Sequence, residues 1–285
     1  MDYTTGGFQR SYRVHIPAGY DGENPLPLVV VIHGAFDNAK GMERFSGFSQ
    51  LADREGFIVL YPNGIGILGF LQHWNAGHCC GKAAEDKIDD IGYLEAAIDD
   101  ISTRLAVDRQ RIYMVGFSNG GMLVHWFAAE KGDMLAAAAP LAASIGGRPT
   151  KEAPEWRIPD PVKPLPILIM HGRIDDDIPY DGGHSAHRGG ERAYWSVTDS
   201  VRFWVEHNGC TESTAAKSDT RSAASIQTWE TCRDQAIVSL YTIENWGHVW
   251  PGPYFTTDLP ADDPLYNFDA AEIIWHFFKP FARNM

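Results

Sequence analysis

The segment Gly116-Phe117-Ser118-Asn119-Gly120 constrains the fold more than any other part of this chain. Residues 111–115, before it, are apolar and rich in strand-forming side chains, and residues 122–129, after it, combine helical propensity with a broad apolar face. Glycines at 116 and 120 remove the Cβ atoms that would collide where a strand turns directly into a helix. We therefore predict a strand, a sharp turn and a helix, with the Ser118 hydroxyl exposed at the turn as a candidate nucleophile.

A serine nucleophile needs a base that accepts its proton and an acid that orients the base. Candidates for both follow Ser118 in the chain order serine, acid, histidine. Residues 164–170 have the pattern of a buried strand and lead to Asp175, and residues 236–243 have a similar pattern and lead to His248. Because an open α/β sheet carries its catalytic groups beyond the carboxyl ends of its strands, we predict Asp175 as the acid and His248 as the base.

Other side chains compete for these roles. Asp176, Asp177 and Asp181 lie in the same acidic loop as Asp175. Two further histidines, His33 and His171, each end a strand pattern and precede a glycine, and we expect them to be buried and hydrogen bonded rather than to transfer protons.

Several separate motifs occur in a fixed order along the chain. They are Val29-Val30-Val31-Ile32-His33-Gly34-Ala35, Trp74-Asn75-Ala76-Gly77, Asp89-Asp90-Ile91-Gly92-Tyr93, Gly116-Phe117-Ser118-Asn119-Gly120-Gly121, His171-Gly172 with Asp175 and Pro179-Tyr180, Asn208-Gly209-Cys210, and Gly247-His248 with Trp250-Pro251-Gly252. With these motifs the chain resembles the polyhydroxybutyrate depolymerase-like esterases, a branch of the α/β-hydrolases that includes feruloyl and acetylxylan esterases of carbohydrate esterase family 1. The resemblance extends from about Arg10 to Pro280 and leaves the substrate open.

The resemblance implies roles for individual positions. It implies Ser118 as nucleophile, Asp175 as acid and His248 as base, which are the residues that the strand ends also indicate. It further implies an oxyanion hole formed by the backbone N–H groups of Asn119 and Ala35, and Phe36 is the alternative to Ala35 if the loop is set one residue later.

Two tryptophans are candidates for substrate contact. Trp246 stands where many relatives carry a glycine, so its ring would narrow the leaving-group side of the pocket. Trp74 either lines the substrate cleft or packs in the core, and the sequence leaves both alternatives open.

Length and composition predict one catalytic domain over residues 1–285. The chain is 44% apolar and 12% aromatic, which suffices for a large core. Strand and helix patterns alternate along it, and we predict the α/β class: an α/β-hydrolase fold with a mostly parallel central sheet covered by helices on both faces. The connections 144–164 and 176–193 are expected to form the rim of a pocket. Strands are predicted near 28–32, 57–61, 111–115, 136–141, 165–170 and 236–243, and helices near 46–54, 88–105, 119–131, 194–208 and 268–279.

Charge and hydropathy narrow the range of partners. With 37 acidic and 24 basic residues the formal net charge is −13, which opposes binding to nucleic acid or to an anionic membrane. No apolar segment is long enough to span a bilayer. We expect the partner to be an ester substrate, either a plant cell-wall polysaccharide ester or a small aryl or acyl ester, and the sequence leaves the oligomeric state open.

The four cysteines bear on localisation. Cys210 and Cys232 bracket a polar stretch and could close it with a bridge, a pairing that the relatives also suggest. The adjacent Cys79 and Cys80 either bond to each other, stay free or pair elsewhere. Because residues 1–20 lack the core of a signal peptide, the protein is either cytoplasmic or a mature chain whose signal was removed, and the cysteines favour a secreted or periplasmic protein.

We expect neither a metal nor a cofactor. The set His73, His78, Cys79 and Cys80 lacks the two separated ligand pairs of a structural zinc site. The acidic loop from Asp175 to Asp181 lacks the spacing of an EF-hand.

The sequence therefore predicts a serine esterase that acts through an acyl-enzyme. A feruloyl ester is the first choice of substrate, acetylated xylan the second and polyhydroxyalkanoate the third. Two alternatives remain: a peptidase or acyltransferase with the same three residues, and an inactive carbohydrate-binding protein on a hydrolase fold.

Overall fold

A nine-stranded sheet forms the centre of the molecule in the computed structural model, which describes residues 3–5, 7–66, 70–187, 190–214, 217–219 and 224–283. The strand order is β13-β14-β15-β10-β7-β6-β4-β5-β3. The six strands from β15 to β5 run parallel, and β3, β14 and β13 pair antiparallel at the two sides. The strands are β3 (Tyr12–His15), β4 (Leu26–Ile32), β5 (Ile58–Pro62), β6 (Val107–Phe117), β7 (Ala137–Leu141), β10 (Ile167–Gly172), β13 (Lys217–Asp219), β14 (Ala224–Trp229) and β15 (Val238–Ile243).

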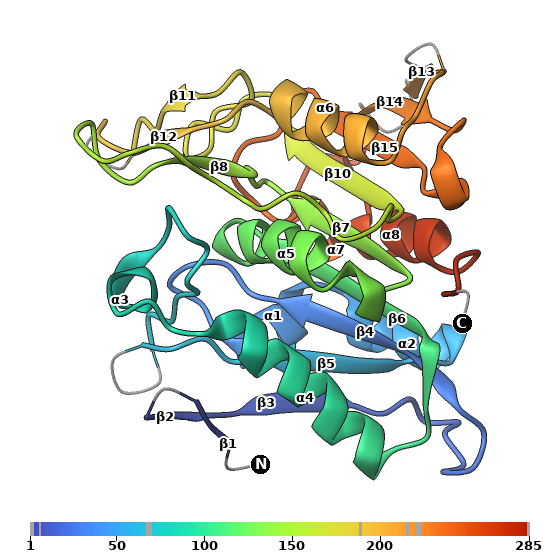
Figure 1. Ribbon diagram of the computed structural model, residues 1–285. Helices are drawn as coiled ribbons and strands as arrows, with labels where there is room; N and C mark the ends of the chain where they lie inside the picture. Colours follow the sequence, from blue (N-terminus) through green and yellow to red (C-terminus); the bar gives the residue numbers. More distant parts are fainter. Residues whose placement is uncertain are drawn as a thin grey trace.

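Helices cover both faces of this sheet (Figure 1). Because successive side chains of a strand point to opposite faces, β4 divides its apolar run between two cores: Leu28, Val30 and Ile32 lie in one, and Val29 and Val31 in the other. The first core is closed by α4 (Asp90–Arg104), α5 (Asn119–Glu130) and α6 (Val197–His207), and the second by α1 (Ala39–Phe45), α2 (Phe48–Glu55) and α8 (Ala270–Phe278).

The predicted architecture agrees with the observed one. All six predicted strands and all five predicted helices are present, with ends shifted by up to about four residues. The predicted helix 46–54 begins at Phe48, because Gly47 before it has a positive φ of 82°. The sequence patterns did not reveal α1, β3, β13 or β14, which are short or lie at the sides of the sheet.

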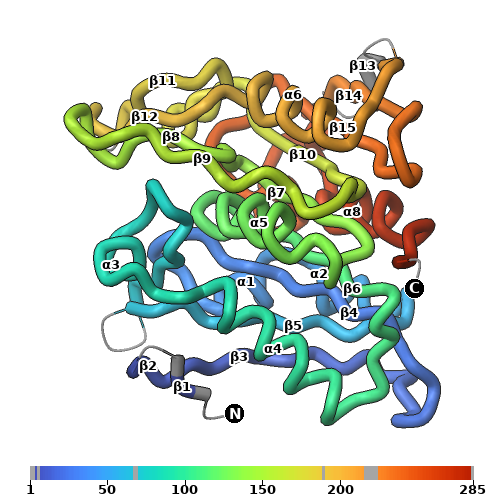
Figure 2. Tube along the Cα trace, in the orientation of Figure 1, coloured from blue at the N-terminus to red at the C-terminus, as the bar shows by residue number. Residues whose placement is uncertain are grey.

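A second, four-stranded antiparallel sheet is built mainly from the two connections that were expected to form the rim of a pocket. Its strands are only two or three residues long, which is too short for a periodic pattern in the sequence. In Figures 1 and 2 it lies beside the ends of β7 and β10, from which its two connections leave the main sheet. Residues 188 and 189 of the second connection lie outside the described residues. The strands are β8 (Gly146–Arg148), β9 (Trp156–Arg157), β11 (Gly183–His184) and β12 (Ala193–Tyr194), in the order β11-β12-β8-β9.

The remaining elements are short. A two-stranded hairpin precedes the main sheet, and two single helices lie in the connections that follow β5 and β15. None of the helices in the described ranges has both the length and the apolar character needed to cross a lipid bilayer. These elements are β1 (Tyr3–Thr5), β2 (Phe8–Arg10), α3 (Gly81–Glu85) and α7 (Pro253–Thr256).

Two disulfides are present. Cys210 bonds Cys232, as predicted, and this bridge joins the chain after α6 to the chain after β14. Cys79 and Cys80 bond to each other, which is one of the three alternatives that the sequence left open.

Candidate active site

Ser118 lies at a sharp turn between β6 and α5, as the sequence predicts. Its backbone has φ 56° and ψ −122°, a conformation that a residue with a side chain rarely adopts. The Ser118 N–H donates a hydrogen bond of 2.9 Å to the carbonyl oxygen of Leu141 at the end of β7. The neighbouring strand therefore helps to hold the turn.

The glycines on either side make this turn possible. A Cβ atom on Gly116 would lie 2.5 Å from the carbonyl oxygen of Gly120. A Cβ atom on Gly120 would collide with the carbonyl oxygen of His33. Since both obstacles are backbone atoms that cannot rotate away, β4, β6 and α5 approach this closely only because both positions are glycine.

His248 follows β15 and faces Ser118. Its Nε2 lies 2.8 Å from Ser118 Oγ, and its ring packs against Phe117 with 5.1 Å between ring centroids. The loop that carries His248 crosses close to the end of β10, where a Cβ atom on Gly172 would collide with the carbonyl oxygen of Trp246. Glycine at 172 therefore permits the approach of the histidine loop.

Asp175 completes the arrangement from the loop after β10. Its Oδ2 lies 2.7 Å from His248 Nδ1, and its Oδ1 accepts hydrogen bonds from the N–H groups of Asp177 (3.0 Å) and Ile178 (2.8 Å). His171 Nε2 lies 3.3 Å from the same carboxylate. These contacts fix the Asp175 side chain, and the competing carboxylates Asp176 and Asp177 do not take its place.

The charge of Asp175 is stabilised despite its burial. Burial by itself raises the pKa of this carboxyl, but the hydrogen bonds from His171 and His248 outweigh that effect and hold the pKa below its ordinary value. Asp175 is therefore ionised at neutral pH. When His248 carries its proton on Nδ1, this N–H donates a hydrogen bond to the Asp175 carboxylate. Nε2 then accepts a hydrogen bond from the Ser118 hydroxyl.

The other two strand-end histidines are buried and hydrogen bonded. His33 Nδ1 contacts the carbonyl oxygen of Gly34 at 2.7 Å, and His33 Nε2 accepts a hydrogen bond from the N–H of Gly64 at 3.0 Å. Burial lowers the pKa of His33 to about 4, so this ring is neutral. His171 Nε2 contacts the carbonyl oxygen of Ile178 at 2.9 Å, which places His171 behind Asp175 as a support.

The two backbone donors expected for an oxyanion hole lie on the expected elements. Asn119 is the first residue of α5, and its N–H is among the donors that a helix leaves unpaired in its first turn. The N–H of Phe36 donates to the carbonyl oxygen of Gln72 at 2.8 Å, whereas the N–H of Ala35 makes no hydrogen bond within the described ranges. Of the two alternatives in this loop, Ala35 therefore keeps a free donor.

The two candidate tryptophans differ in their surroundings. Trp74 is fully buried, its indole N–H donates to the carbonyl oxygen of His33 at 2.9 Å, and its ring stacks with Tyr93. Packing therefore describes Trp74, and substrate contact, the other alternative, does not fit its burial. Trp246 is half-buried beside the histidine loop, and its indole N–H is bonded to the carbonyl oxygen of Val249 at 2.7 Å.

One contact in the site had no signal in the sequence. The side chain of Asn119 accepts a hydrogen bond from the N–H of Trp74 at 2.8 Å and donates one to the carbonyl oxygen of Trp74 at 3.1 Å. This pair of bonds ties the start of α5 to the loop before α3. Sequence alone shows an asparagine after a serine, and only the tertiary structure brings residue 74 beside it.

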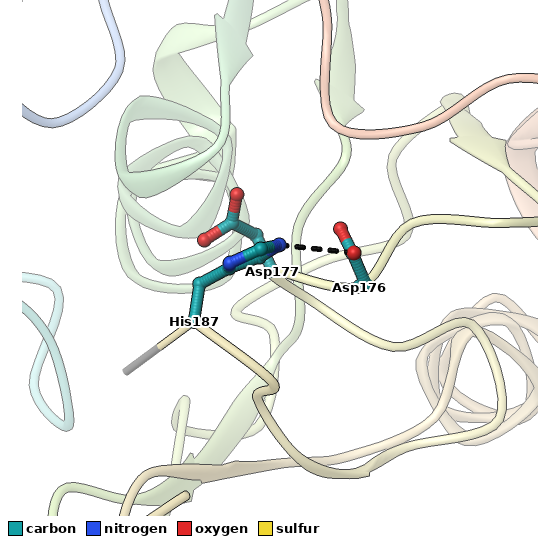
Figure 3. A group of neighbouring side chains, drawn as sticks. All are labelled: Asp176, Asp177 and His187. Atoms are coloured by element: carbon teal, nitrogen blue, oxygen red, sulfur yellow. Dashed lines mark ion pairs between the residues drawn. The ribbon is translucent and has the colours of Figure 1, made fainter. Parts of the chain in front are cut away.

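Residues that could hold a cation lie next to the acid. Among the described residues, Asp176, Asp177 and His187 bring their ligand atoms within 4.8 Å of one another (Figure 3). Asp176 and His187 form an ion pair of 2.9 Å on the surface. The half-buried Asp177 carboxylate lies beside this exposed ion pair.

Comparison with known proteins gives the family of the segment that contains the turn at Ser118. Residues 10–148 match the family described as esterase PHB depolymerase. Feruloyl esterase B of Piromyces equi is 30% identical over 242 residues, which are 84% of this chain and 42% of the relative. The putative esterase NocK of Nocardia uniformis subsp. tsuyamanensis is 28% identical over 270 residues, 89% of this chain and 74% of the relative. This chain thus spans less than half the length of the feruloyl esterase that it matches.

A solved structure extends the similarity to the fold. The acetyl xylan esterase from Aspergillus awamori superimposes with a TM-score of 0.58 at 14% identity, over 83% of this chain and 88% of that one. Together with the sheet and the turn at Ser118, this match confirms the predicted α/β-hydrolase fold. The relatives of this chain carry the names of esterases, in line with the predicted class of carboxylic-ester hydrolase. The predicted resemblance to the polyhydroxybutyrate depolymerase-like esterases is confirmed as well.

Proposed function

We propose that this protein is a serine ester hydrolase in which Ser118 is the nucleophile, His248 the general base and Asp175 the residue that orients the base. The observation that carries the proposal is the continuous chain of contacts from Asp175 Oδ2 to His248 Nδ1 (2.7 Å) and from His248 Nε2 to Ser118 Oγ (2.8 Å). Both distances lie within hydrogen-bond reach, which is the geometric requirement for proton transfer.

The first half of the reaction forms an acyl-enzyme. As Ser118 Oγ attacks the ester carbonyl carbon, its proton passes to His248 Nε2, and the ionised Asp175 stabilises the imidazolium that results. The negative charge on the carbonyl oxygen is held by the N–H groups of Asn119 and Ala35, a stabilisation of about 3 kcal/mol for each donor in comparable sites. The ester C–O bond then breaks, and His248 returns the proton to the departing alcohol.

The second half releases the acid. Water attacks the acyl carbon while His248 accepts a proton from it, and the bond between the acyl group and Ser118 Oγ breaks as that proton returns to the serine. The products are the carboxylic acid and the regenerated enzyme, so no cofactor is needed.

A hydroxycinnamoyl ester such as a feruloyl ester of plant polysaccharide is our first choice of substrate. The similarity to feruloyl esterase B supports it, and the acetyl xylan esterase of similar fold supports acetylated xylan as the second. Polyhydroxyalkanoate is the third, because the family that matches residues 10–148 is described by that polymer. We further propose that residues 1–285 form a single catalytic domain.

The test is hydrolysis of methyl ferulate and of p-nitrophenyl acetate by the wild type and by Ser118→Ala, with circular dichroism spectra of both. We expect cleavage that favours ferulate and that disappears in the variant. Cleavage restricted to acetate would move the substrate to acetylated xylan, and full activity of a folded Ser118→Ala protein would overturn the nucleophile.

We also propose that the protein works in an oxidising compartment, outside the cell or in the periplasm. The two disulfides support this, because such bonds persist where thiols are not kept reduced. Titration of free thiols in the protein as isolated from its source organism should find none, and four free thiols would contradict the proposal.

A further inference from the structure

A cavity of about 450 Å³ lies on the side of the molecule formed by α4 and α5, apart from the three residues of the proposed active site. The indole rings of Trp126 and Trp156 form part of its wall. Charged and amide side chains, those of Asn75, Lys87, Asp89 and Glu130, form another part.

The two indole rings are held in place from behind. Trp126 donates its indole N–H to Glu130 Oε2 at 2.8 Å, and its ring meets Trp156 edge to face with 5.1 Å between centroids. Trp156 in turn stacks on the fully buried ring of His78, with 5.5 Å between centroids and 25° between ring planes. Because these contacts fix the rings before a ligand arrives, little side-chain entropy is lost on binding.

The polar groups around the rings indicate what kind of ligand fits. Asp89 and Glu130 are exposed carboxylates, and Lys87 is the one ammonium group among the residues that line this cavity. A third carboxylate of the lining, Asp90, is buried and paired with Arg10. Two exposed carboxylates against one ammonium disfavour an anionic ligand, and the charged lining disfavours a purely apolar one. A neutral sugar fits both features, because its C–H face can lie on an indole ring while its hydroxyl groups bond carboxylate and ammonium groups.

The cavity shares two elements with the proposed nucleophile. Trp126 follows Ser118 by eight residues on α5, a distance of about 12 Å along the helix axis. On the other side, Asn75 follows Trp74, whose backbone is bonded twice to the side chain of Asn119. A chain of sugars held in the cavity would therefore lie close enough for an attached acyl group to reach Ser118 from a neighbouring sugar.

We propose that this cavity is a binding subsite for the neutral backbone of a polysaccharide, in which sugar rings stack on Trp126 and Trp156 while an ester carried by the same chain is cleaved at Ser118. Cleavage at Ser118 of an ester carried by the bound polysaccharide rests on the proposed function, whereas binding of the sugar rings in the cavity does not. The subsite makes the polysaccharide, and not only its acyl group, part of what the protein recognises.

The binding test uses the full-length Ser118→Ala protein and xylohexaose, titrated by isothermal calorimetry. Trp126→Leu and Trp156→Leu, each added to that background, should weaken binding at least about tenfold, because leucine is apolar but lacks the flat ring. Trp195→Leu is the matched control: it also is a half-buried tryptophan whose N–H is bonded to a glutamate, Glu155, but it lines a different cavity. Absence of xylohexaose binding, or equal weakening by Trp195→Leu, would overturn the subsite.

A second variant protects the test against misfolding. Glu130→Gln keeps the shape of the side chain and should weaken xylohexaose binding a few-fold, since it removes the charge beside Trp126. Unaltered affinity in both Glu130→Gln and a folded Trp126→Leu would refute the assignment.

A kinetic measurement separates this proposal from the proposed function. In a protein with intact Ser118, Trp126→Leu should lower by about tenfold the ratio of kcat/KM on feruloylated xylan to kcat/KM on methyl ferulate. If the wild type hydrolyses neither ester, the proposed function fails, and the calorimetric titration still decides the subsite. If the ratio does not change although both esters are cleaved, the subsite has no part in recognition of the polymer.

Discussion

The turn at Ser118 and the small sheet of β8, β9, β11 and β12 both belong to the end of the molecule where β7 and β10 finish, but they are held in different ways. Ser118 and Asp175 are 8% and 4% exposed and are fixed by backbone hydrogen bonds. The small sheet has strands of two or three residues. Its Arg148 and the residue just before β9, Glu155, each have a half-exposed side chain and approach only to 3.9 Å.

This difference separates two requirements of an enzyme. Proton transfer needs atoms fixed within a fraction of an ångström, and buried backbone contacts supply that rigidity. Recognition of a substrate is set by the surface of connections, which tolerates changes in sequence and length. Substitutions at the turn should therefore abolish activity or stability. Substitutions of solvent-accessible residues in the small sheet other than Trp156 should alter both only slightly.

The largest effect is expected for Asp175→Asn. The amide cannot stabilise a charged imidazole and favours the wrong tautomer of His248, so kcat should fall about 10⁴-fold while the fold is kept. The measurement is steady-state hydrolysis of an activated aryl ester. Asp176→Asn, one residue along on the surface, is the control and should stay within about twofold of wild type; a drop as large as that of Asp175→Asn would mean that the wrong carboxylate has been assigned.

A large loss of stability is expected for Gly120→Ala. The new methyl group would collide with the carbonyl oxygen of His33, the residue just after β4, and this backbone atom cannot rotate away. The free energy of unfolding, measured by urea denaturation, should fall by about 3 kcal/mol. In the control Gly19→Ala the new Cβ meets no atom within 4 Å, and stability should change by less than about 0.5 kcal/mol. Equal stability of the two variants would show that the turn is not locked by close packing.

A smaller and gradual effect is expected as pH falls. Burial lowers the pKa of His33 to about 4 and the pKa values of His78 and His125 to about 3, whereas an unfolded chain binds these protons near pH 6.5. Below pH 6.5 these three histidines therefore bind protons in the unfolded state but stay neutral in the folded state. The free energy of unfolding should fall steadily toward pH 4.

Urea denaturation between pH 7 and pH 4 measures this slope. The variant His125→Gln should reduce the slope, and His184→Gln, at an exposed position in the small sheet, should leave it unchanged. A flat profile in the wild type would contradict the neutral, buried state of these rings.

The smallest effect is expected for Arg148→Ala. Its ion pair with Glu155 is long and half-exposed, so the free energy of unfolding should change by less than about 1 kcal/mol. Thermal denaturation of Arg148→Ala, Glu155→Ala and the double variant measures the coupling of the pair. A coupling free energy between Arg148 and Glu155 above about 2 kcal/mol would show that the small sheet is held as firmly as the turn at Ser118. It would contradict the difference in rigidity between these two regions.

Most of the central sheet could be predicted from the sequence, because its parallel strands are long apolar runs bounded by turn residues. Val29, Val30 and Val31 leave little choice but a strand buried on both faces. The short strands of the second sheet could not be predicted, since two residues carry no period and their pairing depends on segments far apart in the chain. Gly147, for example, pairs with both Tyr194 and Trp156.

The positions of Ser118, Asp175 and His248 were predictable for a general reason: each lies just beyond a strand pattern, and parallel strands bring their carboxyl ends to one edge of a sheet. Their contacts were not predictable. The support of Asp175 by His171 and the attachment of Asn119 to Trp74 depend on distances between loops, which no local pattern contains.

The sequence by itself determined the α/β architecture, the glycine-lined turn and the order of the three candidate residues, because these follow from local periodicity, from the absence of a Cβ atom and from chain direction. The tertiary structure alone decided that Trp74 is buried and that Trp126 and Trp156 border one cavity. It also decided that, among the described residues, the N–H of Phe36 is hydrogen bonded and that of Ala35 is not. The physical reason is that burial, hydrogen-bond partners and cavities arise between segments remote in the chain, whose approach is set by the packing of the whole core.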